Sequence, residues 1–206
     1  MTPKFFYFDM GNVLLRFDHE IACRQMGQVA GISADRVRQI VFDSGLERRY
    51  ERGEVTSREF YDIFCRESGT DGDYEALYRA GGAIFEINVP LIPIVVQLRA
   101  VQHRLGILSN TCEAHWDYCS SGRYSVISKL FDVVALSYVL GALKPERAIF
   151  EAAARLAQAR PQEIFYVDDR NENVAAARDC GFDAVLYTTP ARLAADIRKR
   201  GVRINY

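Results

Sequence analysis

The residues of this chain that are best suited to chemistry follow apolar runs of the kind found in buried strands. They are Asp9, Ser109, Asn110, Lys144, Asp168 and Asp169. In an open parallel sheet, every strand delivers its carboxyl end to the same edge, where such sheets bind their ligands. We therefore expect three carboxylates, a hydroxyl, an amide and an amine to meet at one site.

Three carboxylates at one edge repel one another unless cations lie among them. A hard divalent ion such as Mg²⁺ and the amine of Lys144 can supply this charge. The same groups suit phosphoryl transfer, because Mg²⁺ and Lys144 can neutralise phosphate oxygens while Ser109 and backbone N–H groups donate to another. Asp9 is then left to attack phosphorus, which predicts an aspartyl phosphate that water hydrolyses in a second step.

The alternation of apolar runs and helical patterns predicts the fold that positions these groups. Strands are expected at residues 5–8, 105–108, 133–135, 164–167 and 184–187. Helical patterns separate the later runs, and Pro145 is expected in the first turn of a helix over residues 146–157. Since parallel neighbours need crossover connections, we predict an α/β fold with a doubly wound parallel sheet and a Rossmann-type core.

Residues 16–88 differ in character from the rest of the chain. Amphipathic helical patterns cover residues 21–30, 34–42 and 57–68, and glycines separate them. Thr56 or Ser57 can cap the third of these helices. We predict an inserted helical cap subdomain over residues 16–88 and a core domain formed by residues 1–15 and 89–206.

Size and composition limit the classes of protein to consider. A chain of 206 residues has room for one domain with an insertion. Its net charge of −1 provides no overall attraction to nucleic acid or to an anionic membrane. Five cysteines without a CxxC pair indicate neither a disulfide framework nor a zinc site, and no signal sequence or apolar run of membrane-spanning length is visible. We expect a cytoplasmic protein with a small substrate, and the sequence leaves the oligomeric state open.

Taken in order, the polar motifs resemble those of the haloacid dehalogenase-like (HAD) hydrolase superfamily. They read Asp9-Met10-Gly11-Asn12-Val13, Ser109-Asn110, Lys144-Pro145, and Asp168-Asp169 with Asn173. Three features are similar to the bacterial α-glucose-1-phosphatase-like branch of this superfamily. They are the DxGNV form of the first motif, the SNT form of the second motif with His115 four residues after Thr111, and the segment Glu51-Arg52-Gly53-Glu54. The phosphatase domain of soluble epoxide hydrolase resembles the chain more distantly.

The resemblance implies a Mg²⁺-dependent phosphatase with a small helical cap. It makes Asp9 the nucleophile, and it makes Ser109, Asn110 and Lys144 the phosphate-binding residues. The implied metal ligands are Asp9, the backbone carbonyl of Gly11, Asp168 and Asp169. The implied substrate is a small sugar phosphate such as a hexose 1-phosphate.

Gly11 departs from the pattern of the superfamily. Most of its phosphatases carry a second Asp at this position, which acts as acid and base, and glycine cannot transfer a proton. General acid–base catalysis contributes ~10²–10⁴-fold in rate, so the loss needs an explanation. Three explanations are open. In the first, the leaving group needs little help, as with an anomeric or acyl phosphate. In the second, another residue supplies the proton, and the candidates are Asp18, His19 and His115. The third explanation is a slow or inactive relative that binds a phosphorylated ligand.

A second enzymatic reading is a 2-haloacid dehalogenase that works through an aspartyl ester. That reaction needs neither a metal nor a second acid in the first motif. Asp168 and Asp169 speak against it, because paired acids beside the nucleophile repel a carboxylate substrate unless Mg²⁺ is bound.

Overall fold

A five-stranded parallel sheet forms the centre of the computed structural model, which describes residues 2–206. The strand order is β5-β4-β1-β6-β7. The strands are β1 (Phe5–Phe8), β4 (Arg104–Ser109), β5 (Val133–Leu136), β6 (Ile164–Asp168) and β7 (Asp183–Leu186). The predicted doubly wound parallel sheet is confirmed, and each expected strand lies within two residues of its predicted bounds.

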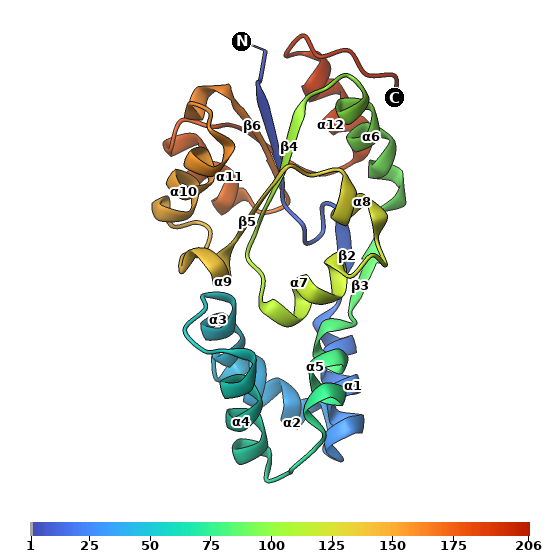
Figure 1. Ribbon diagram of the computed structural model, residues 1–206, viewed down its shortest axis with the longest axis vertical. Helices are drawn as coiled ribbons and strands as arrows, with labels where there is room; N and C mark the ends of the chain where they lie inside the picture. The colour runs from blue at the N-terminus through green and yellow to red at the C-terminus, as the bar shows by residue number, and fades with distance from the viewer. Residues whose placement is uncertain (1) are drawn as a thin grey trace.

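The central strand β1 is buried on both faces. Phe5 and Tyr7 pack on one side, and Phe6 and Phe8 pack on the other. Helices α10 (Arg147–Ala157) and α11 (Asn171–Asp179) cover the first side, while α6 (Ile92–Ala100) and α12 (Pro190–Arg198) cover the second (Figure 1). The aromatic run at the start of the chain is therefore the part of the core that joins both layers of helices.

Of the remaining core helices, one follows the carboxyl end of β4, one lies between it and β5 in the chain, and one follows the carboxyl end of β5. They are α7 (Glu113–Ser120), α8 (Ser125–Lys129) and α9 (Ser137–Leu140). Short 3₁₀ segments precede α6 and β6, at η2 (Val89–Leu91) and η3 (Pro161–Glu163). These 3₁₀ segments, and the two three-residue strands β2 (Leu15–Phe17) and β3 (Phe85–Ile87), are too short to be predicted from periodicity in the sequence.

The expectation that Pro145 lies in the first turn of α10 is wrong. The helix begins at Arg147 after Glu146 as N-cap, and the Lys144–Pro145 peptide bond is cis. The Glu146 N–H donates to the Leu143 carbonyl at 2.8 Å, so the chain completes a turn before the helix begins. Pro145 therefore shapes the turn that carries Lys144.

The helices between β2 (Leu15–Phe17) and β3 (Phe85–Ile87) form a separate layer beside the sheet's carboxyl edge (Figure 1). They are α1 (His19–Ala30), α2 (Ala34–Arg38), the π-helical segment η1 (Gln39–Asp43), α3 (Leu46–Glu51), α4 (Ser57–Ser68) and α5 (Tyr74–Gly82). Thr56 caps α4 in a capping box with Glu59. Because β2 and β3 pair antiparallel, both connections from these helices to the core run side by side.

The helical layer is fastened to the core near α3. Arg52 forms an ion pair with Glu146, and the Ser137 hydroxyl reaches the Glu51 carbonyl at 2.6 Å. Gly53 has a φ of 76°, and a Cβ at this position would collide with the Tyr138 carbonyl. The loop after α3 therefore rests directly on α9.

All five cysteines are free thiols, and three of them are buried. Among residues 2–206, no helix has both the length and the apolar character that crossing a membrane requires.

Gly106 provides a test of how tightly the sheet centre is packed. A Cβ added there would lie 2.5 Å from Tyr7 Cε1 and 2.8 Å from Phe5 Cε1. Ala at an exposed strand position normally stabilises relative to Gly, but here we expect Gly106→Ala to lower the free energy of unfolding by ~1–3 kcal/mol through overpacking. Urea denaturation measures the change. Val134→Ala on the neighbouring strand, at a partly exposed site, is the control and should change stability by less than about 1 kcal/mol.

Candidate active site

Asp9 lies where the central strand ends, directly between the two strands that flank it. Its backbone N–H donates to the Val167 carbonyl of β6 at 2.9 Å. The Oδ1 atom accepts from the Met10 N–H at 2.7 Å and lies 2.8 Å from Lys144 Nζ. The residue is 7% exposed, so the carboxylate is held by fixed partners in a nearly dry environment.

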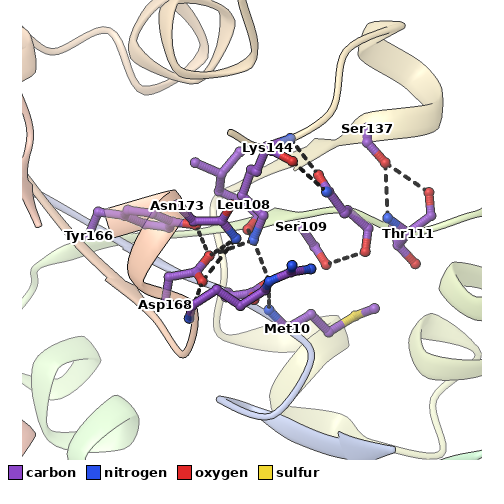
Figure 2. A network of polar contacts seen from close by, with 12 residues as sticks. Met10, Leu108, Ser109, Thr111, Ser137, Lys144, Tyr166, Asp168 and Asn173 are labelled. Carbon is purple, nitrogen blue, oxygen red and sulfur yellow. Dashed lines mark hydrogen bonds and ion pairs between the residues drawn. The ribbon is translucent and has the colours of Figure 1, made fainter. Parts of the chain in front are cut away.

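Lys144 is the cation at the centre of the site (Figure 2). Its ammonium contacts Asp9 Oδ1 and Asp168 Oδ2, both at 2.8 Å, and donates to the Leu108 carbonyl at 3.1 Å. Asn110 exchanges two hydrogen bonds with the Lys144 backbone, at 2.8 and 3.0 Å. Asn110, predicted to bind phosphate, thus fixes the turn that presents the lysine.

Asp168 is fully buried and is satisfied on both oxygens. Asn173 Nδ2 donates to Oδ1 at 3.0 Å and to Oδ2 at 3.1 Å, and the Arg170 N–H donates to Oδ1 at 2.8 Å. Tyr166 adds a short hydrogen bond from its hydroxyl. The first turn of α11 therefore positions the carboxylate that faces Lys144.

The charges of this cluster depend on one another. Burial alone would lower the pKa of Lys144, but the carboxylates of Asp9 and Asp168 outweigh burial and raise it. Burial raises the pKa of Asp9, and the Lys144 ammonium opposes this rise. For Asp168, burial is outweighed by Lys144, so the pKa of Asp168 is lowered. The lysine therefore stays charged and keeps Asp168 ionised.

Asp9, Asp168 and Asp169 form a group whose carboxylate oxygens lie within 4.8 Å of one another. Burial, followed by repulsion from Asp168, raises the pKa of Asp169. Three oxygen ligands of negative charge match the preference of Mg²⁺ for hard donors, and one lysine does not balance three carboxylates. The donor set thus fits the predicted magnesium ion.

A small pocket of about 30 Å³, partly open to solvent, lies beside this cluster. Gly11, Ser109 and Asn110 line it from the core, and Glu51 and His115 line it from α3 and α7. The structure therefore brings the first two motifs together with residues of the helical layer.

The three sequence candidates for a proton donor lie in different places. Asp18 is exposed and caps α1, accepting from the Glu20 N–H at 2.9 Å, and it does not line the pocket. His19 does line it, and its Nε2 lies 3.2 Å from Glu47 Oε1. His115 also lines it, but burial lowers the pKa of His115 to about 4, so this imidazole is neutral at pH 7.

Glu51 is a pocket residue that was not predicted from the sequence. It ends α3, 38 positions or more from either motif that it faces. The segment around it contributed to the family resemblance, but no local pattern distinguishes an inward-facing Glu from a solvated one. Only the packing of α3 on the core places it here.

The space beside Gly11 is occupied. A Cβ built on Gly11 would lie 2.7 Å from Phe17 Cε1 and 3.3 Å from Cδ1. Phe17 belongs to β2 and packs against Phe85 and His19. An aromatic ring thus fills the position where most phosphatases of the resembled superfamily carry an acid.

The sequence profile of the haloacid dehalogenase-like hydrolases matches residues 4–181. The chain belongs to this family. The relatives include D-ribitol-5-phosphate phosphatase of Bacteroides thetaiotaomicron, 25% identical over 181 residues that make up 85% of this chain and 87% of that enzyme. Rat bifunctional epoxide hydrolase 2 is 22% identical over 178 residues, which cover 78% of this chain and 31% of that protein.

Solved structures agree with the family assignment. A HAD-like hydrolase of Porphyromonas gingivalis, 25% identical, superposes with a TM-score of 0.79 over 97% of this chain and 98% of that one. A HAD enzyme of B. thetaiotaomicron, crystallised with magnesium and inorganic phosphate, is 23% identical, with a TM-score of 0.80 over 91% and 95% of the two chains. The HAD fold is confirmed, and the family together with the phosphatase relative supports the phosphatase type of hydrolase predicted from the sequence.

Restoring an acid at position 11 tests the role of Phe17. We expect Gly11→Asp to lower the free energy of unfolding by ~1–3 kcal/mol and to give no gain in hydrolysis, because the new side chain must displace the Phe17 ring. The double variant Gly11→Asp/Phe17→Leu has room for the carboxylate and should recover stability. Thermal denaturation and turnover of each variant check this. A stable, faster Gly11→Asp single variant would contradict the packing argument.

Proposed function

We propose that the protein is a Mg²⁺-dependent phosphatase that cleaves a small phosphate monoester through an aspartyl phosphate on Asp9. The observation that carries this proposal is the convergence of Asp9, Lys144, Asp168 and Asp169 at one sheet edge. The relationship to a sugar-alcohol phosphate phosphatase supports it.

The residues present divide the work of the first step. Met10 N–H and Lys144 both hold Asp9 Oδ1, which orients the carboxylate so that Oδ2 can attack phosphorus. The Lys144 ammonium and the Ser109 hydroxyl are placed to stabilise charge on the phosphoryl oxygens. Mg²⁺ held by Asp9, Asp168, Asp169 and the Gly11 carbonyl would neutralise phosphate charge and the repulsion among the carboxylates.

The substrate class follows from the phosphatase relative. Its substrate is a sugar-alcohol phosphate, which supports a sugar or sugar-alcohol phosphate here, and hexose 1-phosphate stays the prediction made from the sequence. A cytoplasmic location likewise stays a prediction.

A phosphate screen with and without Mg²⁺ tests the function. We expect phosphate release that requires Mg²⁺ and falls by ~10³-fold or more in Asp9→Asn, because the nucleophile is removed. Asp179→Asn at the exposed end of α11 is the matched control and should retain activity. Chloride release from 2-haloacids without metal, or full activity of Asp9→Asn, would contradict the proposal.

Metal binding can be measured without turnover. Mg²⁺ at about 100 times its dissociation constant should raise the free energy of unfolding by ~2.7 kcal/mol, seen as a higher melting temperature. Asp169→Asn should reduce this gain, since it removes one of the three carboxylates. An equal gain in the variant would show that the ion binds elsewhere.

A further inference from the structure

Glu51 lines the same pocket as Gly11, the position at which the usual acid of the superfamily is missing. It lines the pocket opposite the first motif, together with Ser109, Thr111 and His115. The residue is partly buried, and it is the only carboxylate among the pocket-lining residues of the part of the chain that the structure describes. The helical layer thus delivers a carboxyl group to the pocket that the first two motifs line.

The backbone of Glu51 is tied to the second motif by Ser137. The Ser137 hydroxyl lies 2.6 Å from the Glu51 carbonyl and 3.0 Å from the Thr111 carbonyl, and its oxygen accepts from the Thr111 N–H at 2.9 Å. On either side of Glu51, the Tyr50 hydroxyl accepts from the Ala114 N–H at 3.1 Å, and Arg52 pairs with Glu146. These contacts fix the position of the Glu51 backbone at the edge of the pocket that the residue lines.

Thr111 supplies a second, independent sign that a polar group binds here. Its Oγ1 is buried and has no hydrogen-bond partner among residues 2–206, although the residue lines the same pocket. Buried hydroxyls are nearly always paired, so an unpaired one in a catalytic pocket points to a bound polar partner.

We propose that Glu51 is the catalytic acid and base of this reaction, an assignment that rests on the proposed phosphatase function. In the first step, the Asp9–phosphorus bond forms as the bond from phosphorus to the leaving oxygen breaks, and that oxygen takes the proton of the Glu51 carboxyl group. In the second step, water attacks phosphorus and gives its proton to the Glu51 carboxylate. The Asp9–phosphorus bond breaks, and phosphate and the protonated enzyme are regenerated.

The surroundings of Glu51 suit both halves of this cycle. Burial raises the pKa of Glu51 to about 7, against the opposing pull of nearby cations, so both protonation states are available near neutral pH. The titratable and charged groups around it are Glu47 and Arg48 on α3, Lys144 and Arg170 of the core, Cys112 just before α7, and His19 and His115 in the pocket. Burial lowers the pKa of both His19 and His115, and Glu47, whose pKa burial raises to about 8, does not line this pocket. Glu51 is therefore the carboxyl group of the pocket that can give up a proton to an alkoxide.

Two substrates separate proton transfer from the rest of the chemistry. An alkyl phosphate such as a sugar-alcohol phosphate needs a proton on its leaving oxygen, whereas p-nitrophenyl phosphate releases a stable phenolate. We expect Glu51→Gln to lower kcat on the alkyl phosphate by ~10²–10⁴-fold. On p-nitrophenyl phosphate it should keep a rapid burst of about one nitrophenolate per enzyme, followed by slow turnover, because the base for the second step is missing.

Glu54→Gln, in the exposed loop just after α3, is the matched control and should behave as wild type with both substrates. Glu51→Asp, which keeps the carboxyl group, should recover part of the alkyl phosphatase rate and serves if Glu51→Gln does not fold. A Glu51→Gln protein that retains wild-type kcat on the alkyl phosphate within threefold would overturn the assignment of Glu51 alone. A wild-type protein that releases no phosphate from either substrate would overturn the proposed function with it.

The pH profile gives a further readout that a structural role would not move. In the wild type, kcat/KM on the alkyl phosphate should fall as pH rises through about 7, since the proton of Glu51 is lost. Glu51→Gln has no such proton, so this alkaline limb should disappear. Persistence of the same limb in the variant would assign it to another group and overturn the proposal.

Discussion

The contact on which the site depends is the buried ammonium of Lys144 between the carboxylates of Asp9 and Asp168. Removing the lysine ammonium or the carboxylates would leave an uncompensated charge in the buried interior, which costs several kcal/mol. The contact needs β1 between β4 and β6, because the lysine also donates to Leu108 at the end of β4. It also needs the turn around Pro145, which Asn110 holds in place. Strand order, turn geometry and charge balance are thus parts of one arrangement.

A second constraint comes from the antiparallel pair of strands β2 and β3, a ribbon that joins the helical layer to the core. Phe17 on β2 lies against Gly11 and occupies the space of a side chain there, so an acid at that position and this ribbon packing exclude each other. Once the ring is there, a proton donor has to come from another element. Helices α1, α3 and α7 all reach the same pocket, through His19, Glu51 and His115, and Glu51 is the one carboxylate among the described residues that line it.

The site is therefore shared between the core and the helical layer. The half-exposed ion pair between Arg52 and Glu146 contributes little by itself, because solvent screens it. The buried hydroxyl of Ser137 is more specific, since it joins the Glu51 backbone to both the N–H and the carbonyl of Thr111. Opening of the helical layer would break this link and uncover the pocket, and closure would assemble the site around a substrate and exclude water.

The sequence by itself determined the sheet, its five strands and the residues that gather at its edge. These follow from short apolar runs that end in polar residues, a pattern that each segment carries locally and that parallel pairing converts into proximity. The tertiary structure alone decided the position of Phe17 against Gly11, the turn at Pro145, the structural use of Asn110 and the arrival of Glu51 in the pocket. Gly11 and Phe17 are only six positions apart, but the pairing of Phe17 with Phe85 on β3 fixes the ring. The other three depend on contacts between segments tens of residues apart, where neither periodicity nor residue type specifies which side chain meets which. Gly11 shows the difference most clearly. The sequence reveals that the usual acid is missing at this position. Only the packed structure shows that Phe17 leaves no room for an acid there and that Glu51 lines the same pocket.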